Sequence, residues 1–398
     1  MSLSTSPSKT ERIHALDSLR AIMMLLGLVI HSAITYGIFD YGNAWTIKDP
    51  NHTGVFMDYT VALIHSFRMP IFFVVAGFFG AMLFFERSPV KMFKNRIDRI
   101  LYPFIVFVFI LSIAIIFSAA YTQGVFAGAS DPFELAIAPL MILQTWLPPS
   151  TYHLWFLYYL LLITLASFLL ALVFNRLPKF TNGVTSLLNQ LLERPVLKVI
   201  VFSLLTVGLL FLMGGTWVKT SIEWTPDSGT FFFYFFFYGI GWILFKSKHL
   251  LHTFMQYDWM YFILGVVLKT VSFFFPENFN FELVIVLNSL IVWLLIFGIT
   301  GLFIRYGSQH SMLMRYNSDS SYWIYLIHLP FTFLLPGLIA DWNLPAFAKF
   351  ILVLLMTSVI SLITYHYLVR NTFIGKFLNG RKYSRQIFSK KVLVPKVS

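Results

Sequence analysis

The sequence predicts an all-α, polytopic integral membrane protein with about ten transmembrane helices and both termini in the cytoplasm. Of its 398 residues, 58% are hydrophobic and only 12% are charged, which is far from the composition of a soluble domain of this length. Several apolar runs reach the roughly 20 residues that a helix needs to cross a bilayer. Basic residues flank these runs mainly on one side, which gives the orientation.

The predicted spans are 17–39, 57–85, 101–121, 152–174, 198–215, 229–246, 256–275, 282–304, 320–340 and 346–369. An even number of spans places both termini on one side of the membrane. We expect residues 1–370 to form the transmembrane domain. Residues 371–398 then form a basic cytoplasmic tail that contacts anionic lipid.

Most of the 29 Lys and Arg residues lie in, or at the borders of, the segments that share a side with the termini. The opposite loops contain only Lys48 and Lys219. This asymmetry indicates cytoplasmic termini, and it explains the net charge of +12 without nucleic acid as a partner. The polar start leads into span 1 without a small-residue cleavage site, so no cleaved signal peptide is expected. The absence of cysteine excludes disulfides and thiol catalysis.

The stretch LDSLRAIMMLLGLVIH at 16–31, in the first span, has Asp17 and Arg20 near its start and His31 at its end. In one helix, His31 lies about 16 Å along the axis from Arg20. Arg20 would then lie at a membrane face and His31 well inside the apolar region. An ionisable residue at that depth is costly and usually functional. The alternative is a structural histidine bonded to a neighbouring helix.

Two further spans carry polar residues at a similar depth. His65 and Arg68 lie about 12 and 16 Å from the outer end of span 2. Arg68 is a permanent cation, so it either forms a structural ion pair, for example with Asp58, or holds an anion or oxyanion. His328 lies roughly 12 Å from the inner face, one turn after Tyr325.

His153 and Trp155 are expected at the outer interface. An aromatic belt explains Trp155, but it explains His153 less well. The histidines are not spaced as ligand pairs, so we expect no metal site. A buried neutral histidine is instead the natural general base for deprotonating a hydroxyl.

A basic cluster on the inner side contains Lys94, Arg96 and Arg99, followed by Tyr102. Arg96 and Arg99 are three residues apart, so a helix would present both on one face. The cluster contributes to topology in any case. It is also suited to the phosphates of a nucleotide-bearing molecule, because Arg and Lys form charge-assisted bonds to phosphate.

Arg20 and His31 are spaced as R-x10-H, and five pieces follow in order: LDSLRA at 16–21, FRMPIFFVVAGFF at 67–79, KNRIDRILYPF at 94–104, HLWFLYYLL at 153–161 and SYWIYLIHLPF at 321–331. Together they resemble the membrane-bound acyltransferase 3 family. Within it, the first two helices are most similar to the glucan biosynthesis protein C group, the osmoregulated periplasmic glucan succinyltransferases.

The resemblance implies a multi-pass enzyme of the bacterial inner membrane. It would move an acyl group, succinyl in that group, from cytoplasmic acyl-CoA to a hydroxyl of a periplasmic glucan or another envelope carbohydrate. His31 takes the position of the family's catalytic histidine and Arg20 that of its partner arginine. The expected partners are the bilayer, acyl-CoA and the glycan, with no metal; a monomer and a homodimer both remain open.

The candidate site residues fall into three groups. The catalytic group is His31, Arg20, Asp17 and Arg68. The acyl-CoA group is Lys94, Arg96, Arg99 and Tyr102. The substrate group is His65, His153, Trp155, Tyr325 and His328.

Two other functions compete with acyl transfer. In a transporter or flippase, His31, Arg68 and His328 would line a permeation path, although the chain shows no internal repeat of the kind many transporters have. A non-catalytic envelope scaffold is the third possibility. Release of CoA that depends on His31 would distinguish the enzyme from both.

Overall fold

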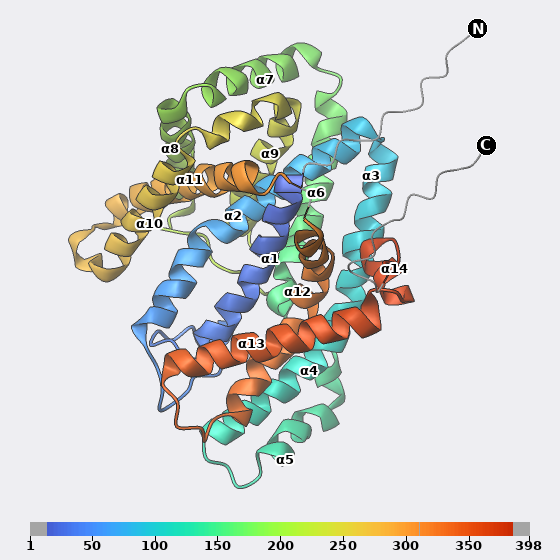
Figure 1. Cartoon of the computed structure of the whole chain (residues 1–398), viewed down its shortest axis with the longest axis vertical. Helices are drawn as coiled ribbons and strands as arrows, with labels where there is room; N and C mark the ends of the chain where they lie inside the picture. Colours follow the sequence, from blue (N-terminus) through green and yellow to red (C-terminus); the bar gives the residue numbers. More distant parts are fainter. Residues whose placement is uncertain (1–13, 310, 385–398) are drawn as a thin grey trace.

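The computed structural model describes residues 14–309 and 311–384, and this part of the chain is a helical bundle without a β-strand (Figure 1). Its helices are α1 His14–Ile34, α2 Val55–Glu86, α3 Pro89–Arg96, α4 Tyr102–Phe126, α5 Pro132–Ile137, α6 Trp155–Phe174, α7 Pro178–Leu192, α8 Pro195–Met213, α9 Ser228–Lys246, α10 Asp258–Phe274, α11 Phe281–Tyr306, α12 Met312–Leu338, α13 Ala346–Thr364 and α14 Phe373–Asn379.

The prediction of about ten transmembrane helices is confirmed. Nine helices in the described part of the chain are long and apolar enough to cross a membrane, and a tenth span results if the bent pair Lys248–Met255 and α10, which meet at 66°, is counted as one. We call the side of loops 35–54 and 214–227 the distal side. The opposite side, where α3, α7 and α14 lie, is the proximal side.

The first helix ends earlier than predicted. α1 stops at Ile34 rather than at residue 39. The carboxylate of Asp58 on α2 accepts hydrogen bonds from the backbone N–H groups of Ile38 and Phe39, at 2.6 and 3.2 Å. These bonds satisfy two backbone N–H groups in the turn after α1 and stabilise the end of the helix at this point. His31 therefore lies one turn from the distal end of α1.

Four other segments differ from a single uninterrupted transmembrane α-helix. The third span continues from α3 through a π-helical turn, Ile97–Leu101, into α4. Residues 132–147 do not form one helix: α5 is followed by two short 3₁₀ turns, Ala138–Met141 and Leu143–Trp146. The amphipathic α7 lies between the spans α6 and α8. Residues 373–379 of the predicted tail form α14, and residues 385–398 lie outside the described part.

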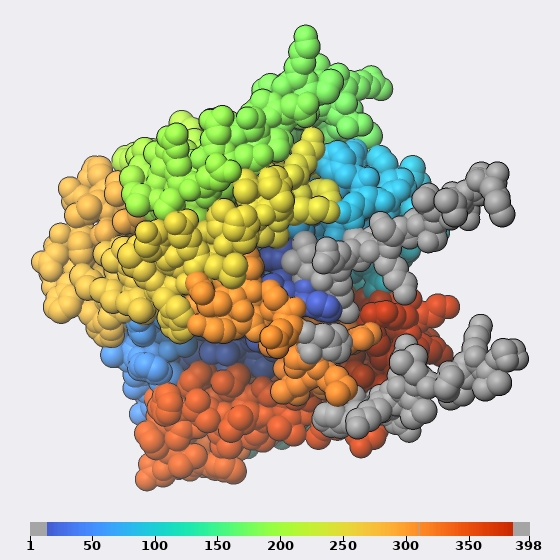
Figure 2. All heavy atoms as spheres, turned by 45° about the horizontal axis from the view of Figure 1, so that its top comes forward, coloured from blue at the N-terminus to red at the C-terminus, as the bar shows by residue number. Residues whose placement is uncertain are grey.

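The centre of the bundle is formed by α1, which packs against α2, α11, α12 and α13 (Figure 1). Most of α1 is buried, and Figure 2 shows its dark blue surface only in small patches between neighbouring helices. Next to it, α2 crosses α9 closely. A Cβ at Gly77 would overlap the Tyr238 carbonyl, and a Cβ at Gly241 would overlap the Val74 carbonyl. Glycine on both helices therefore permits a backbone-to-backbone approach that side chains would prevent.

Candidate active site

Three histidines from distant parts of the sequence meet near the distal side. His31 comes from α1, His153 from the turn that precedes α6, and His328 from α12. The ring centroids of His31 and His328 are 5.2 Å apart, and those of His328 and His153 are 5.1 Å apart. We call these three residues the histidine cluster. The sequence identified each of them separately, and the fold brings them together.

A proline in α12 explains how His153 is held. Pro330 has no N–H, so it cannot pair with the carbonyl of Leu326 one turn earlier. The structure shows Nε2 of His153 at 2.9 Å from that carbonyl. In return, the hydroxyl of Tyr325 donates to the backbone carbonyl of His153 at 2.7 Å. The backbone hydrogen bond that is missing at Pro330 thus leaves a carbonyl free to bind His153, and this contact fixes the start of α6.

The ring of His31 is oriented by an aromatic stack. Trp45, from the loop after α1, lies nearly parallel to it with centroids 5.3 Å apart and an interplanar angle of 16°. The other side of the stack is Phe333 of α12, at 4.3 Å from Trp45. The indole N–H of Trp45 donates to Oγ1 of Thr35 at 3.0 Å, which ties the tryptophan to the end of the helix that carries His31. Sequence reasoning missed Trp45, because an outer-loop tryptophan is ordinary in a membrane protein.

The side chain of Arg68, on α2, lies against α1 one helical turn before His31. Its Nε donates to the backbone carbonyl of Met23 at 2.8 Å, and its guanidinium lies so close to Gly27 that a Cβ there would overlap Nη2. Gly27 and His31 are one turn apart and share a face of α1. Among the described residues, Arg68 forms no ion pair with an acidic side chain. The suggested partner Asp58 instead binds the backbone of the turn after α1.

His65 lies one turn before Arg68 on α2, and its side chain is partly buried. Among the described residues, no ring contact joins His65 to the histidine cluster. Trp155 and Tyr325, both buried, approach it from α6 and α12.

A cavity of about 400 Å³ opens beside the cluster, within the size range of ligand sites. Its wall includes His31, Trp45, Tyr152, His153, Trp155 and Phe333. Loop residues 43–46 and 220–222 and the distal half of α4 complete it. His328 is 1% exposed and is not part of the wall. No group of three His, Cys, Asp or Glu side chains within 14–309 and 311–384 has the geometry to hold a metal ion.

The proximal candidates are separate from the cluster. Arg20 pairs with Asp17 at 3.2 Å and lies over the ring of Phe79 at 5.2 Å. Ten residues of helix separate it from His31, about 16 Å along the axis. Arg20 is therefore far from the side chain of His31, and it lies on the proximal side, toward the basic cluster.

The members of the basic cluster have different surroundings. Nη1 of Arg99 donates to the carbonyl of Leu378 in α14 at 2.9 Å. Nε and Nη2 of Arg96 are buried, with no hydrogen-bond partner in the described part of the chain. The π-helical turn begins directly after Arg96, so α-helical spacing does not relate the two side chains. Lys94 and Tyr102 are exposed.

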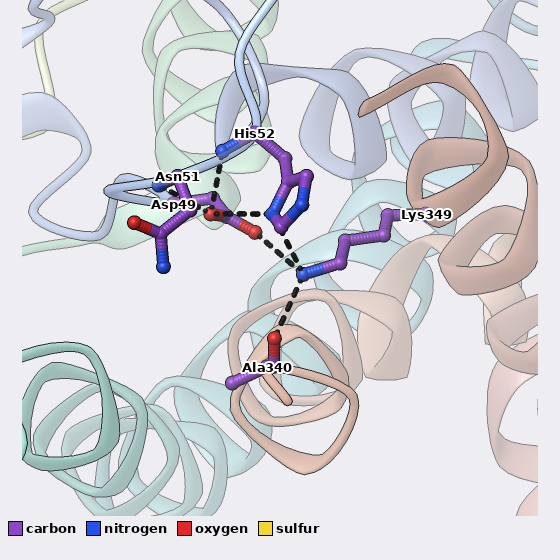
Figure 3. A network of polar contacts seen from close by, with 5 residues as sticks. All are labelled: Asp49, Asn51, His52, Ala340 and Lys349. Carbon is purple, nitrogen blue, oxygen red and sulfur yellow. Dashed lines mark hydrogen bonds and ion pairs between the residues drawn. The ribbon is translucent and has the colours of Figure 1, made fainter. Parts of the chain in front are cut away.

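A buried ion pair holds the distal loop that carries Trp45 (Figure 3). Nζ of Lys349, in α13, is 3.1 Å from Oδ2 of Asp49, and it also donates to Nδ1 of His52 at 3.2 Å and to the carbonyl of Ala340 at 2.9 Å. Both partners of the pair are buried, with side chains 0% and 3% exposed. The backbone N–H of Asp49 donates to the carbonyl of Thr35 at 3.0 Å. The pair therefore connects α13 to the same turn that anchors Trp45.

The fold and the site define a multi-pass membrane protein with two histidines, His31 and His153, in the wall of a distal cavity. A family model described as "Acyltransferase domain" matches residues 13–366, so the chain belongs to this family and is a membrane acyltransferase. This confirms the family resemblance seen in the sequence motifs.

The chain is similar to glucans biosynthesis protein C of Escherichia coli (strain K12 / DH10B), with 30% identity over 159 residues, covering 40% of this chain and 39% of the relative. For the protein of the same name from E. coli O6:K15:H31 (strain 536 / UPEC), the identity is 31% over 162 residues, with the same coverages of 40% and 39%. The chain thus spans about two fifths of the length of these relatives. No solved structure matches the chain.

The ion pair generates a stability prediction. Lys349→Met should lower the free energy of unfolding by about 3–5 kcal/mol, because the buried carboxylate of Asp49 would lose its cation and keep only its contact with the His52 ring and the backbone N–H bonds from Asn51 and His52. Thermal or denaturant unfolding in detergent measures this. Replacing both partners, as in Lys349→Met with Asp49→Leu, should restore most of the loss.

The matched control is the exposed pair of Lys248 and Glu86, at 2.8 Å with side chains 51% and 27% exposed. Lys248→Met should cost at most about 1 kcal/mol. Equal losses for the two lysine variants would show that burial adds nothing to the Lys349 pair.

Proposed function

We propose that this acyltransferase moves an acyl group from acyl-CoA, bound from the proximal side, to a hydroxyl of a glycan in the distal cavity. The observation that carries the proposal is the position of His31, which lines the cavity one turn from the permanent cation of Arg68. The flanking basic residues support a cytoplasmic proximal side. The membrane would then be the bacterial inner membrane and the distal side the periplasm. The name of the relatives supports a glucan as the acceptor.

In the proposed reaction, His31 takes the proton of the acceptor hydroxyl while its oxygen attacks the thioester carbonyl. The carbonyl oxygen becomes an oxyanion in the tetrahedral intermediate. The C–S bond then breaks, and the CoA thiolate receives the proton from His31. The products are an ester and free CoA, and His31 returns to its neutral form.

Arg68 fits one of two roles in this reaction. Its guanidinium, unpaired with any described carboxylate, can stabilise the oxyanion of the intermediate. Alternatively, it can bind a carboxylate at the end of the acyl group. We propose succinyl as the acyl group, since its carboxylate would need a cation where it crosses the apolar interior, whereas neutral acetyl would not.

For the donor, we propose that Arg96 binds the phosphates of CoA, with Lys94 and Tyr102 nearby at the proximal surface. Two buried guanidinium nitrogens of Arg96, Nε and Nη2, have no hydrogen-bond partner in the described part of the chain, although the group also interacts with Tyr238. These two nitrogens favour Arg96 for this role, because charge-assisted bonds to phosphate would satisfy them. Arg20 and Asp17 lie between this cluster and His31 along α1. We propose that Arg20 contacts the donor between its phosphates and its thioester.

His31→Ala should lower the rate of acyl transfer at least 100-fold, the lower end of what a positioned base contributes. The assay is CoA release by the purified protein in detergent, with succinyl-CoA and a glucan. The control is His366→Ala, a histidine of the last span that faces Tyr316 and lies outside the cluster. Normal turnover by folded His31→Ala protein would exclude the mechanism. Glucan exchange without CoA release would support a transporter instead.

Arg68→Lys keeps the charge and loses the planar fork that binds a carboxylate through two bonds. If Arg68 selects the donor, the variant should lose succinyl transfer about tenfold or more and keep acetyl transfer. If Arg68 stabilises the oxyanion, both rates should fall together. Rates for succinyl-CoA and acetyl-CoA in the same assay distinguish these results, and no change in either would refute both roles.

Arg96→Gln together with Arg99→Gln should weaken CoA binding far more than acceptor binding, as measured by calorimetry. We expect the single Arg96→Gln variant to account for most of the loss, about tenfold in Kd, because one charge-assisted hydrogen bond is worth about 1.5–3 kcal/mol. Arg99→Gln alone breaks the bond to Leu378 and should act mainly on α14. An unchanged Kd in the double variant would leave the cluster only a topological role.

A further inference from the structure

The protonation of His328 can be assigned from its contacts. Its Nδ1 lies 2.7 Å from the carbonyl oxygen of Tyr325 and 3.1 Å from that of Ile324. A carbonyl only accepts hydrogen bonds, so Nδ1 carries the proton. In the neutral ring, Nε2 is then an acceptor. This atom is buried and has no partner among the described residues.

The neighbouring ring has a matching atom. Nδ1 of His31 is also buried without a hydrogen-bond partner in the part of the chain that the structure describes. The two rings are 5.2 Å apart between centroids and tilted by 38°. Buried polar atoms are nearly always paired, and exceptions often mark a catalytic role. Here two unpaired nitrogens, one able to donate and one able to accept, lie in adjacent rings.

The third histidine of the cluster has a different assignment. His153 uses Nε2–H for the Leu326 carbonyl, so its Nδ1 is an acceptor, and this atom is also buried without a partner among the described residues. The ring of His153 contacts His328, whereas no ring contact joins it to His31 in the described part of the chain. Trp45 covers one face of His31, and its N–H is already bonded to Thr35. Among these neighbours, His328 alone offers His31 an acceptor through an adjacent ring.

We propose that His328 is a positioning residue that sets the tautomer of His31. Nδ1–H of His31 donates to Nε2 of His328, so Nε2 of His31 is unprotonated and available as the base at the cavity. The bond tightens when substrate binds, since catalytic hydrogen bonds in unliganded enzymes are often long or poorly aligned. His328 thereby performs the orienting task that a carboxylate has in a Ser-His-Asp triad. A neutral imidazole performs it without placing another charge in the apolar interior.

The catalytic consequence rests on the proposed function, but the tautomer itself does not. The first experiment therefore reads the tautomer directly. Full-length protein labelled with ¹⁵N-histidine is placed in nanodiscs, and the His31 resonances are identified by their loss in His31→Gln. We expect His31 to have a protonated Nδ1 and an unprotonated Nε2. A protonated Nε2 and a bare Nδ1 in His31 would overturn the proposal, whatever the activity.

The second experiment is kinetic. His328→Phe removes the acceptor and should lower kcat roughly 10- to 100-fold, the usual cost of losing a residue that orients a functional histidine. KM for donor and acceptor should stay within about twofold, because His328 lies outside the cavity wall. His328→Gln provides an amide oxygen as acceptor and should retain more activity than His328→Phe. His366→Phe is the control for a histidine in a span and should leave kcat unchanged.

The possible outcomes test the orienting role of His328 separately from the proposed acyl transfer. An unchanged kcat in folded His328→Phe would overturn the orienting role, as would a folded His328→Gln variant no better than His328→Phe. If neither variant folds, the ¹⁵N spectrum of the unmodified protein still decides the tautomer. If that spectrum is as expected but the protein transfers no acyl group, the proposed function fails and the tautomer assignment stands.

Discussion

A polar side chain inside this bundle has to find its partner within the protein, because neither lipid nor apolar side chains can supply one. The structure meets this requirement with bonds between separate elements. His153 uses a carbonyl of α12 that Pro330 leaves unpaired, Arg68 uses a carbonyl of α1, and Lys349 uses a carboxylate of the distal loop. Each bond satisfies a buried group and at the same time connects two separate elements of the fold.

The same requirement explains why the site is built from backbone as much as from side chains. Carbonyl oxygens determine which nitrogen of His328 and of His153 carries the proton. These carbonyls belong to one stretch of α12, residues 324–326, in the turn before Pro330. A membrane helix with a proline can therefore provide hydrogen-bond acceptors at a depth where an ionised side chain would be expensive.

Much of the fold could be predicted, because a transmembrane helix needs an apolar run of about 20 residues and such runs are easily recognised in the sequence. The end of α1 could not, because it depends on the Asp58 side chain from another helix. Individual histidines could be identified by the cost of burying them, but their meeting depends on how three helices pack. The pairing of Lys349 with Asp49, 300 residues apart, has no local signal at all. The prediction that Arg96 and Arg99 share one face assumed an uninterrupted α-helix. The structure has a π-helical turn directly after Arg96, and Arg99 bonds to Leu378 in α14.

The size of the distal cavity has a consequence for what the protein can recognise. At about 400 Å³ it lies near the lower end of the range for sites that enclose a small molecule. A polymeric acceptor would place only its reacting unit inside, while the rest of the chain stayed outside the wall formed by Trp45 and residues 220–222. Selection would then act on the local shape of one unit and would be indifferent to polymer length, so short fragments should be as good acceptors as long chains.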